Sequence, residues 1–408
     1  MRIVDIIYFV FLLTLSLTLS LDPTGFHSRL KDLLFVVLVV YGVIYCLKRR
    51  QYLAGINRVT LLSVILIPIW GMFIAFITDN LTDWGYAMSQ VRSMLYIGIF
   101  FFMVTMKLNV LLKAIWINGI VLACVTLLLF FISQMGGIFL DAVYDYCNLS
   151  GNFMMAYNRN FLGYTINGLY FKAGSLIIFS FIYNLYQYQG PLKTVYSVIL
   201  FLSLMVAGSR TPMLVQLMIL LVYLYDKNII GKFLTRVSAL VLFGGLIMVT
   251  YLLATQENED SNEVKYENYE SYIDDMSEKG HIIWGAGVGS EFYAKGRGYK
   301  LAYSELSYLD ILRMYGIPVG GAFIFLFFAP FFYMRRYFPD SMFLKRYCWG
   351  YVLFLILSGT NPTLLGSVGL TGLAIFMALD NKIQEGRRDE IMREEEEEGL
   401  TIDGLRLR

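Results

Sequence analysis

Long apolar windows with few or no charged residues recur along the chain and define its predicted architecture. A helix needs about 20 apolar residues to cross a hydrocarbon core roughly 30 Å thick. Windows at or near this length predict twelve membrane-spanning helices, at residues 3–21, 32–47, 59–78, 90–106, 114–132, 168–186, 194–208, 212–225, 237–254, 305–333, 347–360 and 363–379. The pattern therefore predicts an all-α, polytopic integral membrane protein with about twelve transmembrane helices.

Two polar breaks inside overlong apolar stretches determine the predicted number of spans and the orientation of the chain in the membrane. Gly208–Pro212 divides the stretch 194–225, and Gly359–Pro362 divides the stretch 347–379. Lys and Arg in short loops mark the cytoplasmic side of a membrane protein. With both breaks included, the basic loop residues fall on one side, at 48–50, 58, 107, 113, 193, 227–236 and 335–346. Both termini are then expected to be cytoplasmic.

Two long segments, residues 133–167 and 256–304, are left on the outer side. Long loops in compact proteins usually carry function. The second segment is rich in Tyr and Gly, and it is expected to form short helices over the membrane face as one large outer loop. Residues 1–380 form the predicted membrane domain, and residues 381–408 form a charged cytoplasmic tail that is expected to be a solvated end.

The composition excludes several classes of protein. Of the 408 residues, 57% are hydrophobic and only 16% are charged, whereas soluble proteins carry about 25% charged residues. A soluble enzyme, a nucleic-acid-binding module and a disordered protein are therefore excluded, and the net charge of +2 indicates no surface for a polyanion. Four separated cysteines and two histidines form no metal-binding motif, so neither a metal nor another cofactor is expected.

Charged residues in or near the apolar windows gather near the outer ends of the predicted helices. These residues are Arg92, Arg159, Lys172, Arg210, Glu305, Asp310 and Arg313. Charges inside membrane segments are costly and default to a functional hypothesis. Their grouping at one depth predicts a single site at the outer interface, because a path for ions would need charges staged through the membrane.

Two arginines are candidate ligands for an anion at this interface. Thr211 and Pro212 are typical of a helix start, so Arg210 would lie beside a helix N-terminus, which attracts anions. The guanidinium fork also matches phosphate geometry. Arg159 lies in a segment too polar to face lipid and too apolar for a free loop. The alternatives are a snorkelling Arg210 and a structural Arg159, and snorkelling is the favoured interpretation of Lys172.

The start of the tenth predicted helix, residues 304–313, offers a candidate proton acceptor. Ser304 is a plausible N-cap, and the helix dipole favours the ionised form of Glu305 at the first helical position. A carboxylate held there is suited to take a proton from a sugar hydroxyl; the alternative is a capping glutamate without chemistry. Asp310 and Arg313, spaced i and i+3, either neutralise each other or leave Arg313 as a second phosphate ligand.

The second outer segment contributes a glycine cluster and aromatic side chains. Gly285–Gly289 resembles a nucleotide-binding motif only superficially, because no strand precedes it, and it is expected to form a tight turn instead. Trp284, Tyr299 and Tyr303 are suited to stack on sugar rings, although aromatic residues also gather at membrane interfaces without binding anything.

Three motifs in this order resemble the O-antigen polymerase and ligase family, and more closely its Wzy-type polymerases. They are Gly208–Thr211, then Trp284–Ser290 in a large outer loop, then Ser304–Gly316. Arg159, followed by Gly163 and Asn167, is similar to a stretch in the family's preceding outer segment. The resemblance in motifs is confined to about residues 208–316, while the plan of spans covers most of the chain.

This resemblance implies metal-independent glycosyl transfer at the periplasmic face of the bacterial inner membrane. The donor would be a glycan on undecaprenyl pyrophosphate, and the acceptor the terminal sugar of another lipid-linked repeat unit. Arg210, Arg159 and Arg313 would hold the pyrophosphate, Glu305 would act as the base, and a chain-length regulator would be a possible partner.

Two other functions stay open. The first is an O-antigen ligase that joins finished glycan to the lipid A core; the family's ligases typically carry a histidine where this chain has Tyr303-Ser304-Glu305. The second is a transporter or flippase for lipid-linked glycans. Such proteins often contain two related halves, and the second outer segment has no counterpart in the first half of this chain.

Overall fold

The computed structural model describes residues 3–161, 164–207, 210–229, 259–278, 280–304, 306–336, 341–360 and 363–406. The first half of this part contains α1 (Ile3–Leu21), α2 (Leu30–Arg49), α3 (Gly55–Ile77), α4 (Trp84–Met94), η1 (Leu95–Gly98), α5 (Ile99–Met103), α6 (Leu108–Gln134), α7 (Gly137–Ser150), β1 (Phe153–Phe161), β2 (Tyr164–Phe171), η2 (Gly174–Leu176), α8 (Ile177–Tyr186) and α9 (Lys193–Met205). The second half contains α10 (Arg210–Asp226), α12 (Glu259–Glu278), α13 (His281–Trp284), β3 (Phe292–Ala294), η3 (Lys295–Arg297), β4 (Tyr299–Leu301), α14 (Ser307–Arg336), α15 (Met342–Gly359) and α16 (Ser367–Arg406).

Apolar helices of membrane-spanning length dominate this architecture. Five described helices, α1, α2, α3, α6 and α14, are long and apolar enough to cross a bilayer. Large apolar side chains on their outer surfaces are exposed, including Ile3, Leu47 and Phe76. An apolar exterior on such helices is suited to lipid rather than water. The expected class, a predominantly helical membrane protein, is therefore confirmed at this level, while the number of spans stays a prediction.

Several of the predicted spans are not continuous helices, among them 305–333, because α14 is kinked at Gly316, where φ is 74°. The window 90–106 is divided into α4, the 3₁₀ turn η1 and α5. The window 168–186 begins in strand β2, and helix α8 starts only at Ile177. The reason is pairing with an earlier segment, because β2 forms an antiparallel hairpin with β1, from Phe161 opposite Tyr164 to Phe153 opposite Phe171. The window 237–254 lies outside the described residues.

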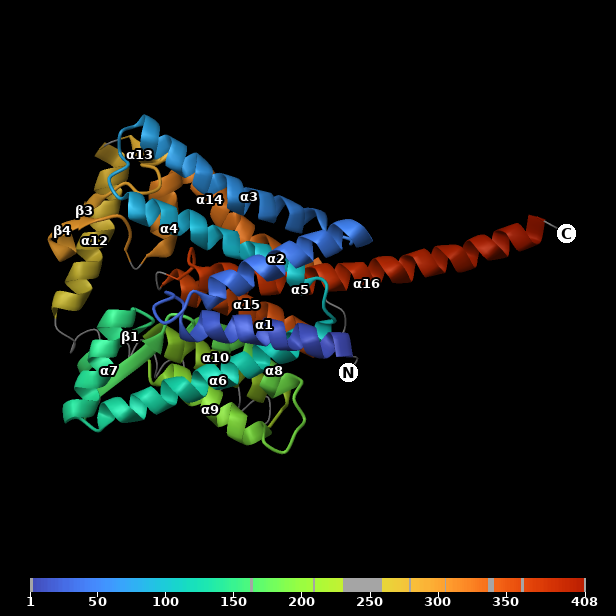
Figure 1. Ribbon diagram of the computed structural model, residues 1–408, viewed down its shortest axis with the longest axis horizontal. Coiled ribbons are helices and arrows are strands. Elements are labelled where there is room, and N and C mark those ends of the chain that lie inside the picture. The colour runs from blue at the N-terminus through green and yellow to red at the C-terminus, as the bar shows by residue number, and fades with distance from the viewer. Residues whose placement is uncertain are drawn as a thin grey trace.

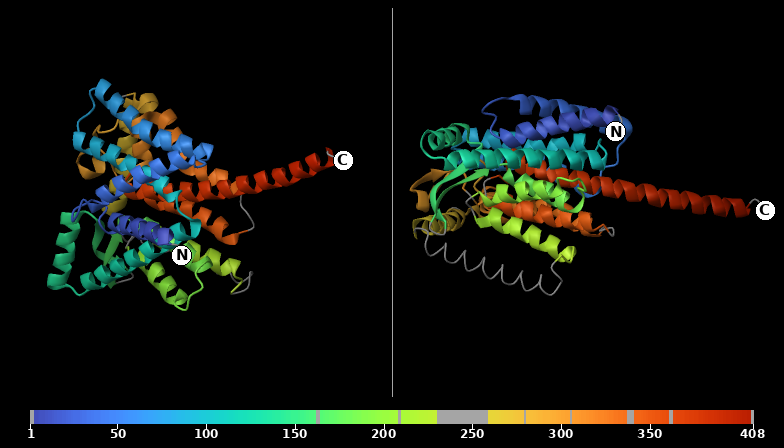
Figure 2. Two further views of the ribbon diagram at one scale, coloured as in Figure 1. Left: turned by 45° about the vertical axis from the view of Figure 1, so that its right-hand side comes forward. Right: turned by 90° about the horizontal axis from the view of Figure 1, so that it is seen from below.

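The two segments predicted to be on the outer side lie at the same end of the molecule. Figures 1 and 2 show α7 and β1, from the first segment, and α12, β3 and β4, from the second, at one end of the helical body. The N-terminus lies at the opposite end, and α16 projects beyond the body there. The second segment forms helices, as expected, and the hairpin of β3 and β4 in addition.

The first turns of α16 lie in the packed centre of the body. Residues of α16 from Leu370 to Leu379 are almost entirely buried, and the ring of Phe376 stacks on Tyr351 of α15 with centroids 3.9 Å apart. Gly372 allows the close approach of α15, since a Cβ there would lie 2.1 Å from the Phe354 ring. This packing fixes the N-terminus of α16, which matters for the site described next.

Candidate functional site

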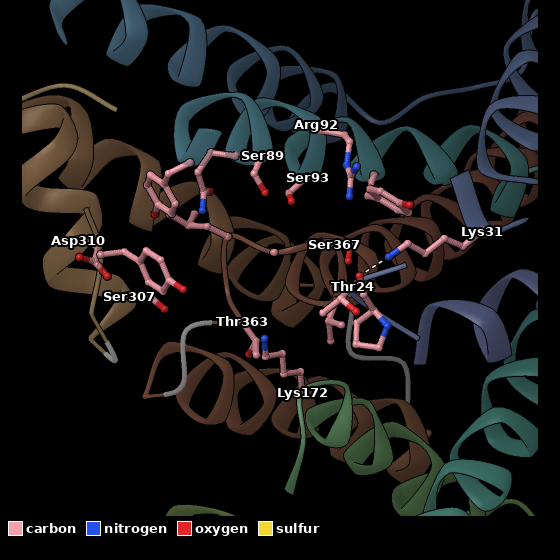
Figure 3. Close-up of a pocket in the computed structure, with 18 residues that line it drawn as sticks. Thr24, Lys31, Ser89, Arg92, Ser93, Lys172, Ser307, Asp310, Thr363 and Ser367 are labelled. Carbon is pink, nitrogen blue, oxygen red and sulfur yellow. Dashed lines mark hydrogen bonds between the residues drawn. The ribbon is translucent and has the colours of Figure 1, made fainter. Parts of the chain in front are cut away.

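A cavity of about 310 Å³ lies where the N-terminal ends of α2, α14 and α16 meet α4 (Figure 3). Its size falls at the lower end of the range typical of small-molecule sites, about 300–1,000 Å³. Polar side chains from distant parts of the sequence line it. The lining residues are Pro23, Thr24, Lys31, Tyr86, Ser89, Gln90, Arg92, Ser93, Tyr96, Lys172, Tyr303, Ser307, Asp310, Thr363, Leu365, Gly366, Ser367 and Val368.

Helix α4 supplies the largest share of this lining. Its N-cap is Asp83, whose carboxylate accepts the Tyr86 N–H at 2.8 Å. Side chains at i, i+3 and i+4 share one face of a helix, so Ser89, Arg92 and Ser93 point the same way, into the cavity (Figure 3). The polar side chains at the start of the apolar window 90–106 therefore form one wall of the cavity.

The connection between α1 and α2 carries Lys31 into the cavity. Asp22 organises this connection, because its carboxylate accepts the backbone N–H groups of Phe26 and His27, each at 2.9 Å, and the Asn152 amide at 2.9 Å. Burial raises the pKa of Asp22, but these hydrogen bonds outweigh it and hold the pKa below its usual value. Lys31 Nζ in turn donates to the carbonyl oxygens of Asp22, at 3.2 Å, and Pro23.

Two further cations, Arg92 and Lys172, line the same cavity without a partner among the described residues. Lys172 directly follows β2, and its backbone N–H donates to Asn152 O at 3.1 Å. Burial lowers the pKa of Lys172. Within the described ranges, neither the Arg92 guanidinium nor the Lys172 ammonium forms a hydrogen bond or ion pair with the protein. Such groups are available for an anionic ligand, and arginine offers two parallel donors to a phosphate.

The N-terminus of α16 adds the partial positive charge of a helix dipole to the cavity. Ser367 and Val368, its first residues, line the cavity. The first N–H groups of a helix carry the positive end of its dipole. In α16 that of Gly369 donates to Thr363 O at 3.2 Å, and those of Ser367 and Val368 have no acceptor among the described residues. A tight turn precedes α16, in which Gly366 N donates to Thr363 O at 3.1 Å. Together with the three cations, this helix end makes the cavity chemically suited to a phosphate group.

A different set of groups lines the other side of the cavity. The rings of Tyr86 and Tyr303 stack with centroids 4.9 Å apart and planes 8° from parallel. Asp310 is only 3% exposed, and its carboxylate accepts the Tyr272 hydroxyl at 2.5 Å and the Ser304 N–H at 3.2 Å. Figure 3 shows Asp310 and Ser307 across the cavity from Lys31. Aromatic faces, hydroxyl groups and a carboxylate are the groups that bind sugars.

Arg313, a predicted phosphate ligand, does not line the cavity. Its guanidinium is fully buried and donates to Ser290 Oγ at 2.9 Å, Ser290 O at 3.0 Å and Ala302 O at 2.8 Å. It lies 3.7 Å from Asp275 and over the ring of Phe292. Arg313 therefore joins the segments that flank β3 and β4, whereas Asp310 is bonded to Tyr272 and Ser304.

The glycine cluster is a close-packing element, as the expected tight turn requires. Gly285, Gly287 and Gly289 all have positive φ, between 78° and 87°. Gly287 N donates to Met314 O at 3.0 Å, and a Cβ at Gly287 would lie 2.4 Å from the backbone of Ala75. Gly289 O accepts the N–H groups of Thr82 and Asp83, which places the start of α4. The glycine cluster thus packs against α3 and fixes the start of α4, the helix that lines the cavity.

The remaining predicted site residues are distributed as follows. Arg210 begins α10 and Arg159 pairs with Ile166 in the first hairpin, but the side chains of both, and the whole of Glu305, lie outside the described part. Trp284 and Tyr299 are exposed and do not line the cavity, whereas Tyr303 does.

Sequence reasoning missed Lys31 and the turn before α16. Lys31 lies just outside the apolar window 32–47, and only the fold brings it to the site. Thr363–Ser367 follows a predicted helix break, and its Thr, Gly and Ser residues were a usable signal for a helix start. In the described part, no group of three His, Cys, Asp or Glu side chains is placed to hold a metal ion.

Comparison with known proteins gives no assignment. No protein-family model matches the chain, and no curated protein matches it.

Proposed function

We propose that the chain is a membrane glycosyltransferase that polymerises oligosaccharide repeat units carried on undecaprenyl pyrophosphate. The observation that carries the proposal is the cavity, in which Lys31, Arg92 and Lys172 lie with a helix N-terminus opposite a carboxylate and stacked tyrosines. The order of the motifs at residues 208–316 supports the same function. We further propose that the protein lies in the bacterial inner membrane with both termini cytoplasmic, and that a chain-length regulator acts with it.

In this proposal the cations bind the leaving group. The acceptor hydroxyl oxygen bonds to the anomeric carbon of the donor, and the bond from that carbon to the pyrophosphate oxygen breaks. The electron pair leaves with the pyrophosphate, whose charge Arg92, Lys31 and Lys172 stabilise. No metal takes part in this reaction. Arg210 and Arg159 are proposed as further pyrophosphate ligands, and Trp284 and Tyr299 as contacts for the glycan outside the cavity.

The hydroxyl proton must pass to a base as the new bond forms. The carboxyl groups near the start of α14 are the candidates, since Asp310 lines the cavity and Glu305 occupies the position matched by the family resemblance. A transporter is disfavoured because the cations that line the cavity lie together, near the loop between α1 and α2, rather than being staged along the helices. A ligase is disfavoured by the absence of histidine from residues 303–305.

Deleting the gene in the producing bacterium tests the proposal. Loss of a polymerase leaves a lipid core that carries a single repeat unit, whereas loss of a ligase or a flippase leaves a bare core. Surface glycan separated on a gel distinguishes these patterns directly. A bare core after deletion would reject the polymerase in favour of one of the other two functions.

A further inference from the structure

We propose that Asp310 is the group that accepts the proton of the acceptor hydroxyl, in an acceptor subsite formed with Gln90 and the stacked pair Tyr86 and Tyr303. This inference rests on the glycosyl transfer proposed above. It assigns the role of general base to Asp310 rather than to Glu305, and it divides the cavity into an acceptor subsite and a pyrophosphate subsite.

The surroundings of Asp310 orient its carboxylate and leave one oxygen with spare capacity. Oδ1 accepts the Tyr272 hydroxyl at 2.5 Å and the Ser304 N–H at 3.3 Å, while Oδ2 accepts only the Ser304 N–H, at 3.2 Å, among the residues the structure describes. A carboxylate oxygen has about two lone-pair positions. Oδ2 therefore retains a lone-pair position for a ligand hydroxyl.

No cation forms an ion pair with this carboxylate in the part of the chain that the structure describes. Arg313 is the nearest candidate by sequence, but its NH1 and NH2 groups donate to Ser290 and Ala302, and its charge acts on Asp310 only through space. Hydrogen bonds from neutral donors hold the Asp310 side chain in place without a paired charge. A carboxylate held in this way can accept a proton without breaking an ion pair, which suits a general base.

Gln90 provides an independent indication that a hydroxylated ligand binds here. Gln90 lines the cavity from α4, and its buried amide oxygen has no hydrogen-bond partner in the described structure. Buried acceptors are nearly always satisfied in folded proteins, so an unsatisfied one in a residue that lines a cavity points to a missing donor. A sugar hydroxyl supplies that donor. Gln90 lies four residues after Tyr86, hence on the same face of α4.

The stacked tyrosines complete the subsite. Tyr86 and Tyr303 both line the cavity, and Tyr303 remains 46% exposed. Aromatic rings offer flat apolar surfaces for the C–H faces of a pyranose ring, while Gln90 and Asp310 bind its hydroxyl groups. The donor pyrophosphate then occupies the opposite side, near Lys31 and Arg92 (Figure 3).

The proton transfer balances in this arrangement. The acceptor oxygen forms its bond to the anomeric carbon of the donor as the carbon–oxygen bond to pyrophosphate breaks. The hydroxyl proton passes to Asp310 Oδ2, and the pyrophosphate departs with the bonding electrons. The protonated Asp310 releases its proton to water after the product leaves.

Purified full-length protein in lipid nanodiscs, supplied with undecaprenyl-pyrophosphate-linked repeat units, provides the test. We expect Asp310→Asn to lower kcat by roughly 10²- to 10⁴-fold, the range for loss of a general base, while the Kd for undecaprenyl pyrophosphate stays within about two-fold, because the cations are untouched. The matched control Asp145→Asn, which changes an exposed carboxylate of α7 outside the cavity, should keep kcat within about three-fold. Gln90→Leu should raise the KM for the acceptor more than it lowers kcat.

The outcomes separate this inference from the proposed function. Near-normal turnover by Asp310→Asn, or loss of turnover in Glu305→Gln alone, overturns the assignment of Asp310 as the base. Neither result contradicts the proposed polymerase function. Failure of the unmodified protein to extend the donor rejects the polymerase itself. If Asp310→Asn does not fold, Tyr272→Phe decides, because it removes one donor to the carboxylate; a kcat lowered several-fold at unchanged donor Kd supports the assignment, and an unchanged kcat overturns it.

Discussion

Arg313 NH2 donates to the backbone oxygen of Ser290 at 3.0 Å, and NH1 donates to the Ser290 hydroxyl at 2.9 Å. Through a third hydrogen bond, to Ala302 O, one buried guanidinium joins both ends of the segment that contains β3 and β4. Tyr303, which lines the cavity, follows Ala302 directly. Arg313 is therefore a positioning residue, which holds the segment that carries Tyr303 at the cavity.

Replacing Arg313 should accordingly destabilise the protein. Arg313→Ala removes the donors from three buried acceptors, and each unsatisfied acceptor costs about 1–3 kcal/mol; we expect a total loss of at least about 3 kcal/mol. Arg313→Lys should recover little, because an ammonium lacks the planar fork that joins two segments. Thermal unfolding of the purified protein measures the effect. An unchanged Tm together with lost binding of undecaprenyl pyrophosphate would instead make Arg313 a ligand.

Arg92 should show the reverse behaviour. Its guanidinium faces the cavity without a protein partner among the described residues, so Arg92→Ala should leave the Tm within about 1–2 °C. A hydrogen bond to a charged group contributes about 1.5–3 kcal/mol, so the Kd for undecaprenyl pyrophosphate should rise roughly ten- to hundred-fold. Lys113→Ala, which removes an exposed cation of α6, is the matched control and should not change the Kd. Equal effects of the two variants would exclude a specific role for Arg92.

The glycine cluster gives a prediction about folding rather than about binding. Gly287→Ala places a Cβ 2.4 Å from the backbone of Ala75 at a φ of 86°, so both the contact and the backbone conformation are unfavourable. We expect a large loss of folded protein, because rigid backbone atoms must shift. Gly55→Ala is the control, since no atom lies within 4 Å of its Cβ position. Fluorescence-detected size-exclusion chromatography compares the two, and equal yields would contradict the close packing.

The sequence predicted the apolar helices well because their signal is local. A window of about 20 apolar residues identifies a spanning helix without knowledge of its neighbours, and α1, α2, α3, α6 and α14 are such helices. The window at 168–186 failed because its first residues pair with β1, and hydropathy averaged over a window does not distinguish a paired strand from a helix.

The site was less accessible from sequence because it is assembled from distant segments. Arg92, Lys172 and Asp310 stand out as charges near helix ends, and all three line the cavity. Lys31 carries no such signal, since it lies just outside an apolar window. The partners of Arg313 could not be deduced either, because they depend on how residues 285–302 fold back over α14.

Lys172 makes the binding of an anionic donor depend on pH. Burial lowers the pKa of Lys172, so this side chain loses its charge at a lower pH than an exposed lysine does. The protonated form attracts a pyrophosphate and the neutral form does not. Affinity should therefore be highest below the lowered pKa and should fall as the pH rises through it, with the decline beginning below the ordinary lysine value of about 10.4. Lys172→Arg is the matched variant, because arginine stays charged throughout this range. The affinity for undecaprenyl pyrophosphate, measured between about pH 7 and pH 10, should fall with pH in the unmodified protein and fall less steeply in Lys172→Arg, where Lys31 is the remaining lysine of the cavity. The same pH dependence in both proteins would mean that another group titrates and that Lys172 does not bind the donor.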